Sequence, residues 1–262
     1  STDVPKFIEL YCTADKAKKN EEQCTSLNKI QVDILRLKAQ KLVEIADKQG
    51  GTTALQTYES AGNQYLDVYK KYCETPIRNG QPAQAEKCDE LVYNAAKAFQ
   101  AARLVAKSIA ARMILLNPSN HMDKSPLAKK AVYEIGGNFQ AIAVYEQAAE
   151  WYERYAKDDK SAEKADQALS DAVLLRLGLG DEVKAIEDAT LFQRNYGQSK
   201  PTQAASVAFA IGAHYAEKED WDKTQASLKG SMSLIDRAGV DVQVQAHATL
   251  ARAYAKMKGD QG

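Results

Sequence analysis

The chain has 262 residues, enough for one large domain or two small ones with a substantial apolar core. Lys and Arg together number 35, as do Asp and Glu, so the chain has no net charge at pH 7 and lacks the excess of cations with which proteins bind nucleic acid. Only 14 glycines and 6 prolines are present, few of the residues that turns require, and this favours helix throughout. The best apolar runs, 113–116 and 172–175, span about one helical turn, too short to cross a membrane. We therefore expect an all-α protein with no transmembrane segment and no nucleic-acid partner.

Two helices are predicted in the first quarter of the chain. Apolar residues recur every three or four positions over 27–45, which predicts one long helix, and Gly50-Gly51 ends it. Thr53 and Gln56 have the spacing of a capping box. We therefore expect the next helix to begin at Thr53 and to run towards Cys73.

The following segments also read as helix and loop. Residues 74–82 contain two prolines and an Asn-Gly pair, which predict a loop. Residues 88–116 alternate alanine with larger apolar residues at helical spacing, and 117–120 end this segment. Ser125 followed by Pro126 is typical of a helix N-cap with proline at the first helical position, so a new helix is expected there.

The four cysteines form two local pairs, Cys12 with Cys24 and Cys73 with Cys88. Each pair opens on Tyr-Cys and closes on Glu-x-Cys-x-x-Leu, which indicates sequence duplication. A helix that ends near the first cysteine and another that begins near the second would bring the two sulfurs together, so we predict two disulfides. Metal binding and free thiols are the alternatives, but neither pair has the short spacing of a zinc site, and no histidine lies near either one in sequence.

Paired cysteines indicate an oxidising compartment, either a bacterial periplasm or the extracellular space. No Asn-x-Ser/Thr glycosylation site occurs, because Asn117 is followed by Pro118, and this favours the periplasm. The chain begins at Ser1 without a charged and apolar leader, so we expect any signal peptide to have been removed or to lie outside the given sequence.

Beyond Ser125 a helical pattern recurs. Large-small pairs, among them Ile135-Gly136 and Ile211-Gly212, lie on the first helix of successive units, and Gly180-Asp181 and Asp220-Trp221 lie at turns. These residues resemble the tetratricopeptide repeat (TPR), a helix-turn-helix unit of about 34 residues. The resemblance covers 129–162, 166–199 and 205–238, a first helix from 244 onward and, more loosely, 87–120.

The resemblance implies an all-α, right-handed superhelical solenoid of antiparallel helix pairs. We expect disulfide-linked helical hairpins with degenerate repeats in 1–124, and regular repeats in 125–262. The last helix would expose its apolar face, so we expect the repeats to continue beyond residue 262; the alternative is that this helix caps the solenoid.

Small residues mark the expected helix contacts within the repeats. Gly136, Gly212 and Ala251 lie where the first helix of a unit closely approaches its partner, and Ala148 and Ala185 lie at the contact on the second helix. Thr224 departs from the pattern at that second position, where a small residue is usual.

The sequence is also similar to the TPR proteins of bacterial envelopes, which include outer-membrane-associated lipoproteins and the periplasmic repeat proteins of delta-proteobacteria. The residues that carry this narrower resemblance are 125–131, before an Ile-Gly pair, and 91–96, after a cysteine.

The TPR resemblance implies a non-catalytic scaffold that binds a peptide or protein segment on the concave face formed by the first helices. Carrying over the usual groove positions gives Tyr133, Gln140, Leu174, Leu177, Phe209, Glu217, Arg252 and Lys256. The larger apolar members would form an apolar track. The alternative for Leu174 and Leu177 is that they belong to the core between repeats, because a register error of one residue exchanges the faces.

The sequence leaves three other functions as alternatives. His121, His214 and His247 suggest packing or surface positions rather than a metal site, since no carboxylate is matched to them, and no cofactor is expected. The main alternative to a scaffold is a thiol-disulfide redox protein or sensor that uses the cysteine pairs. A repeat sensor for a small molecule would require a deep pocket with converging polar groups.

Overall fold

The computed structural model describes residues 3–12, 16 and 19–259. Throughout this part the regular structure is helical and contains no β-strand, which confirms the predicted all-α class. The chain divides into two compact units, Ser1–Asn138 and Phe139–Gly262. The boundary lies inside a helix, whereas the predicted division after residue 124 falls in the loop that precedes that helix.

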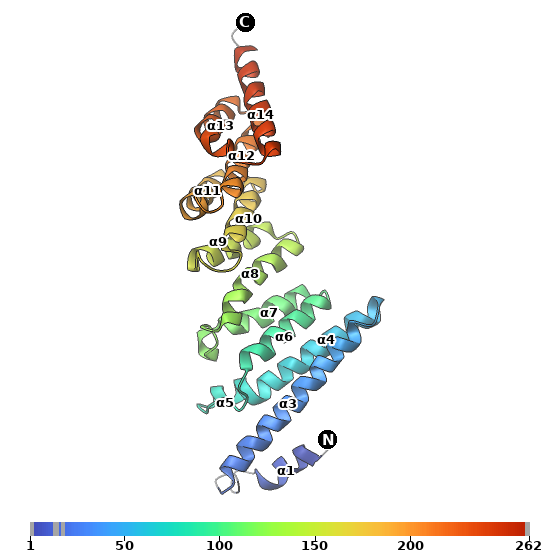
Figure 1. The fold of residues 1–262 in the computed structure, drawn as a ribbon. Coiled ribbons are helices and arrows are strands. Elements are labelled where there is room, and N and C mark those ends of the chain that lie inside the picture. The colour runs from blue at the N-terminus through green and yellow to red at the C-terminus, as the bar shows by residue number, and fades with distance from the viewer. Residues whose placement is uncertain (1–2, 13–15, 17–18, 260–262) are drawn as a thin grey trace. The chain divides into compact units, whose positions relative to one another are not determined.

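The helices of both units follow one another with short connections (Figure 1). Those that begin in the first unit are α1 (Asp3–Tyr11), α3 (Glu21–Ala46), α4 (Gly51–Tyr69), the π-helical turn η1 (Lys70–Glu74), α5 (Thr75–Arg78), α6 (Cys88–Ala101), α7 (Val105–Leu116), the 3-10 turn η2 (Pro118–Asn120) and α8 (Pro126–Ala141). Those of the second unit are α9 (Tyr145–Asp158), α10 (Ala165–Gly178), α11 (Glu182–Tyr196), α12 (Pro201–Glu217), α13 (Trp221–Ile235) and α14 (Val240–Gly259).

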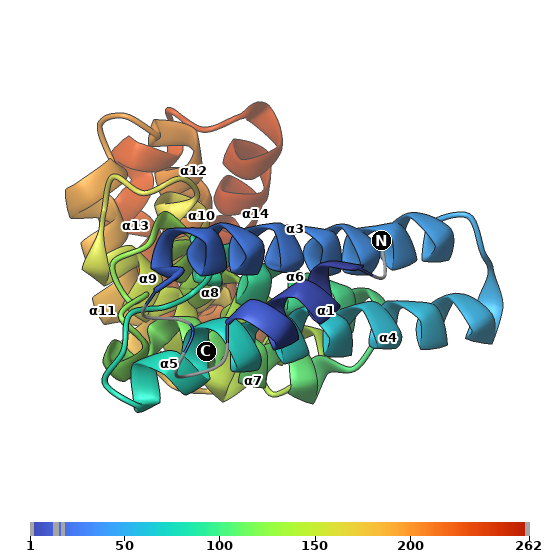
Figure 2. The same cartoon turned by 90° about the horizontal axis from the view of Figure 1, so that it is seen from below.

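In the first unit, α3 and α4 form a long antiparallel hairpin, which Figure 2 shows side by side over most of its length. The buried residues of α3 recur at helical spacing, with Val32 and Ala39 in one core cluster with Tyr65 and Tyr69 of α4. The second face of α4 packs on α6. The two helices approach closely at Gly62, because a Cβ at that position would lie 2.7 Å from the Phe99 ring.

The start of α4 differs from the prediction. The helix begins at Gly51, two residues before the expected N-cap Thr53, and no side-chain cap bond forms at its N-terminus. The physical reason is the glycine pair: Gly50 takes an extended conformation, and Gly51 has a φ of +59° that lets the chain turn at once into the helix. Thr53 therefore lies inside the first turn of α4, and the predicted capping box is wrong. The helix before it begins earlier than expected, at Glu21, and ends at Ala46.

Residues 88–116 form a pair of helices rather than one segment, and the turn between them recurs in the second unit. In each of four turns a residue with positive φ follows the first helix: Arg103, Ala143, Gly180 and Glu219. The next N–H donates to the carbonyl five residues earlier, as in Leu104 to Phe99 (2.9 Å) and Asp181 to Arg176 (2.9 Å). This is the Schellman geometry of a helix C-terminus. The repeated turn supports the expected succession of helix pairs and extends it to the loosely matching residues 87–120.

The small residues at the predicted helix contacts lie mostly where expected. In the second unit a Cβ on Gly212 would overlap the Leu228 side chain, so α12 and α13 need glycine there. Ala185 is fully buried. Thr224 is also fully buried and satisfies its hydroxyl by donating to the Asp220 carbonyl at 2.8 Å. Ala251 on α14 is exposed.

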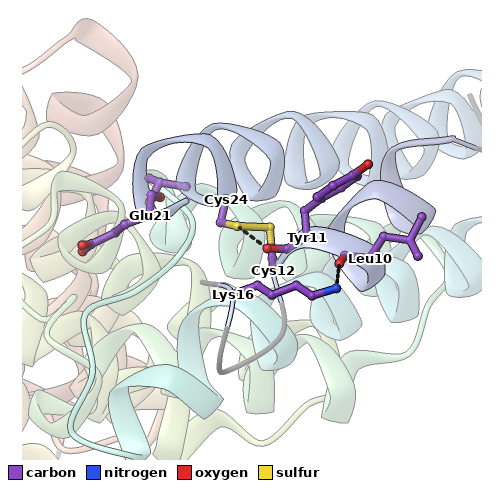
Figure 3. The surroundings of a disulfide bond; sticks show 7 residues. Leu10, Tyr11, Cys12, Lys16, Glu21 and Cys24 are labelled. Carbon is purple, nitrogen blue, oxygen red and sulfur yellow. Dashed lines mark hydrogen bonds between the residues drawn. A yellow bond between two sulfur atoms is a disulfide. The ribbon is translucent and has the colours of Figure 1, made fainter. Parts of the chain in front are cut away.

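Both disulfides are present, as predicted. Cys73, however, does not lie at a helix end: it is in η1, and the helix continues through α5 to Arg78, so the loop predicted from residue 74 begins only after Arg78. Cys12 directly follows α1 and pairs with Cys24 in the first turns of α3, with Cα atoms 5.6 Å apart (Figure 3). Cys73 pairs with Cys88, the first residue of α6, with Cα atoms 6.0 Å apart. Such bonds are typical of proteins from oxidising, exported compartments.

A buried arginine joins three helices of the first unit. Arg112 on α7 has only 1% of its surface exposed. Its guanidinium donates to Glu134 (2.9 Å), Asn138 (2.8 Å) and Gln100 (2.7 Å). A buried charge is stable only when it is paired and hydrogen-bonded, and these contacts meet that condition. The network links α6, α7 and α8 inside the first unit.

Candidate functional site

A groove opens between α10 and α12, the first helices of two successive pairs in the second unit. Its volume is about 640 Å³. The residues that line it are Leu174, Leu177, Gly178, Leu179, Gly180, Ala210, Ala213, His214, Glu217 and Lys218. The groove therefore lies between two of the helices from which the TPR resemblance predicts a binding surface.

One wall of the groove is apolar and partly accessible. Leu174 is 51% exposed and Leu179 is 45% exposed, although both are large apolar side chains. The opposite wall carries the small residues Ala210 and Ala213, which leave room for a side chain of a ligand. Leu177 also lines the groove but is only 7% exposed. Water-exposed leucines in a concave site favour burial of an apolar partner.

The polar rim is organised by Glu182, the first residue of α11. Lys218 donates to Glu182 Oε1 at 2.7 Å, and His214 Nε2 lies 3.3 Å from the same oxygen. Lys223 lies 3.8 Å from Oε2 and stands over the Tyr215 ring. The hydrogen bond from Lys218, followed by that of His214, lowers the pKa of Glu182 to about 2, so its carboxylate is ionised at any physiological pH.

The predicted groove residues divide into two sets. Leu174, Leu177 and Glu217 come together in this groove. Leu177 is also a core residue, as the alternative prediction stated, whereas Leu174 is not. Phe209 is half-buried and packs against the cluster of Leu228, so it is not free to contact a ligand without loss of core packing.

The other predicted positions do not line the groove. Tyr133 lies in the first unit and is half-buried. Gln140 accepts a hydrogen bond from the Tyr152 hydroxyl at 2.7 Å. Arg252 and Lys256 are exposed on α14.

Most residues of the groove and its rim were not predicted as binding residues, among them the lining residues Leu179, His214 and Lys218 and the rim residue Glu182. Leu179 belongs to a turn, and Glu182 lies on the second helix of its pair. The TPR resemblance predicts binding residues only on the first helices, so it could not indicate either residue. His214 was predicted to be a packing or surface residue rather than a metal ligand, and not a binding residue. A partial signal was present in Lys218, which adjoins the predicted Glu217.

The remaining histidines offer no comparable site. His247 is exposed, with Asp236 at 3.6 Å, and His121 is exposed at the end of a 3-10 turn. Among the described residues, no group of three or more His, Cys, Asp or Glu side chains is placed to hold a metal ion.

The cysteines differ in accessibility. All four form disulfides, and Cys73 is fully buried. Cys12 is half-buried and lies beside the exposed residues Leu10 and Tyr11 (Figure 3). The Cys24 sulfur lies 3.6 Å from the Tyr11 carbonyl oxygen. The bonds by themselves favour neither a structural nor a redox role.

A second set of charges is buried between α9, α10 and α11. Arg176 donates to Glu153 at 2.6 Å, and Lys157 lies 3.2 Å from Asp188, which is 2% exposed. Burial, followed by the nearby Glu153, raises the pKa of Asp188 to about 6, while Lys157 opposes this shift. Asp188 Oδ2 and Arg176 Nη2 have no hydrogen-bond partner among the described residues. None of the described cavities is lined by these residues, so the cluster belongs to the core.

No family model and no curated protein matches the chain. Among solved structures it is similar to a chain described as BtubC (BKLC) from P. vanneervenii, with a TM-score of 0.42, 13% identity and coverage of 78% of this chain and 91% of that one. It is also similar to a chain described as DHF58 filament, with a TM-score of 0.23, 20% identity and coverage of 90% of this chain and 100% of that one.

In the described residues, no helix combines the length and the apolar character that crossing a bilayer demands.

Proposed function

We propose that this protein is a non-catalytic scaffold of the TPR type that binds a peptide or protein segment in the groove between α10 and α12. The observation that carries the proposal is the exposure of Leu174 and Leu179 inside a concave site. Leucines at half exposure in a groove gain free energy when a partner covers them.

We further propose that the protein acts in the bacterial cell envelope, in the periplasm. The two disulfides support an oxidising location. The similarity of 125–131 and 91–96 to envelope TPR proteins supports the narrower assignment.

The groove is tested by selection from a displayed library of random peptides. Wild-type protein, Leu174→Glu and Val183→Glu are immobilised in parallel. Val183 is the matched control, because it is an apolar residue of the same unit that is 69% exposed but does not line the groove. We expect peptides that bind wild type and the Val183 variant but not the Leu174 variant. An empty set, or binding that ignores Leu174→Glu, would refute the proposal.

The alternative function, thiol-disulfide exchange, is favoured by one feature, the partial exposure of Cys12. Exchange requires attack on an accessible sulfur. Titration with a glutathione redox buffer distinguishes the two functions. If the Cys12–Cys24 bond stays oxidised at cellular glutathione potentials, its role is structural. If the bond equilibrates with glutathione at these potentials, its role is thiol-disulfide exchange.

A further inference from the structure

The ionisable residues that line the α10–α12 groove are not balanced. They are His214, Glu217 and Lys218. Lys218 is held 2.7 Å from Glu182, so its charge is already matched by a carboxylate on the rim. Glu217 is exposed and makes no hydrogen bond or ion pair within the described part of the chain. The unmatched charge of the groove is therefore negative.

The neighbouring charges outside the groove leave this balance unchanged. Lys223, the second cation near Glu182, lies 3.2 Å from Asp220. Asp181 is shared by Arg176 at 3.6 Å and Lys184 at 3.7 Å. Each of these cations faces a carboxylate, so none of them is available to neutralise Glu217.

The helix backbones also contribute negative charge to the groove. Gly178 is the last residue of α10, Glu217 is the last residue of α12, and both line the groove. The C-terminal end of an α-helix carries a partial negative charge of roughly half an elementary charge. Two helix C-termini and a free carboxylate therefore meet beside the apolar wall, an arrangement that favours a cation.

We propose that the groove between α10 and α12 selects segments that place a lysine or arginine beside an apolar side chain. The apolar side chain covers Leu174 and Leu179 and faces the space above Ala210 and Ala213. The cation pairs with Glu217. This inference deepens the proposed function and rests on it, because it names the chemistry of the segment that the same groove binds.

The test is the composition of the peptides that the selection yields. The probe is the random peptide library, and the peptides counted are those bound by wild type and lost in Leu174→Glu. We expect Lys and Arg to exceed Asp and Glu in this set by about threefold, the size that one partly exposed ion pair produces. Glu217→Gln should reduce the bias, and Glu217→Lys should reverse it.

A matched control separates the groove from the general charge of the surface. Glu187 is an exposed glutamate on α11 that does not line the groove, so Glu187→Lys should leave the basic bias unchanged. The bias should also fall as salt is raised, because an exposed ion pair is screened.

The outcomes distinguish this inference from the proposed function. A populated peptide set with no basic excess, or a bias that Glu217→Lys leaves intact, overturns the charge preference while peptide binding stands. A set with acidic excess does the same. An empty set overturns both, because no groove ligand then exists.

Discussion

The two disulfides close loops of similar length, yet their removal should have different consequences. The cysteines are separated by 12 positions in Cys12–Cys24 and by 15 in Cys73–Cys88, so loop entropy assigns about 3 kcal/mol to each bond. Cys73 and Cys88 belong to the core cluster of the first unit. Helix α1, by contrast, has no buried residue, and its Phe7 is 49% exposed. Helix α1 therefore contributes no buried side chain of its own to the core.

The perturbation is a pair of double variants, Cys73→Ser/Cys88→Ser and Cys12→Ser/Cys24→Ser. For the first we expect a loss of about 4–5 kcal/mol in the free energy of unfolding, of which about 3 comes from loop entropy and the rest from hydroxyls placed in an apolar core. For the second we expect less than about 1 kcal/mol, because α1 detaches without unfolding the core.

The assay is urea unfolding followed by far-UV circular dichroism under non-reducing conditions. Tryptophan fluorescence serves as the control, because Trp151 and Trp221 both lie in the second unit and report on that unit alone. Hydrogen exchange should show faster exchange in α1 of the Cys12→Ser/Cys24→Ser variant. Equal losses in the two variants, or a loss near 3 kcal/mol in the second, would refute the view that α1 is held mainly by its covalent link.

Three further predictions follow from buried groups. Because the folded protein raises the pKa of Asp188 from 3.8 to about 6, this carboxyl contributes stability below pH 3.8 that is lost as the pH rises through 6. The Asp188→Asn variant should therefore become more stable relative to wild type as the pH rises from 4 to 7, by at most about 3 kcal/mol. Thermal melts of both proteins across this range test the prediction. A difference in melting temperature that stays constant with pH would contradict it. Tyr69→Phe should stabilise the protein by about 1 kcal/mol, because the fully buried Tyr69 hydroxyl has no partner among the described residues. Tyr93→Phe should destabilise the protein, because it removes a 2.7 Å hydrogen bond to the Glu134 carboxylate. Midpoints of urea unfolding that move in the same direction for both variants would count against this account. Gly212→Ala should cost about 1–3 kcal/mol, because its Cβ overlaps Leu228, and an unchanged melting temperature would show that α12 and α13 can separate.

Local signals were sufficient for the disulfides and for the succession of helix pairs. A cysteine at each end of a short loop leaves few pairings, and Tyr11-Cys12 and Tyr72-Cys73 carried a visible duplication. The repeat turn was readable at Gly180, because glycine is the usual residue at positive φ. It was not readable at Arg103, where a non-glycine residue adopts the same conformation and sequence offers no such sign.

The boundaries of single helices were less predictable. Thr53 and Gln56 fit a capping box by spacing, but Gly51 begins the helix first because it can turn at positive φ. A cap motif competes with the backbone freedom of the residues before it, and spacing alone does not show which of the two determines the start.

The groove was predicted only in part, because a helix carries several neighbouring apolar positions. Leu174 and Leu177 lie three residues apart, and one is half exposed while the other is buried. Phe209 turned inward onto the Leu228 cluster. The rim depends on Glu182, which approaches from another helix, and such a contact becomes visible only once the helices are packed.

The most direct test of the central claim is the affinity of one groove-selected peptide, measured by isothermal titration calorimetry. Leu174 is 51% exposed, so its replacement by glutamate should leave the fold intact. We expect Leu174→Glu to weaken binding by about tenfold or more, since a carboxylate replaces an apolar contact. Val183→Glu, at 69% exposure outside the groove, should bind as wild type does. Equal affinities for all three proteins would contradict the assignment of the α10–α12 groove as the binding site.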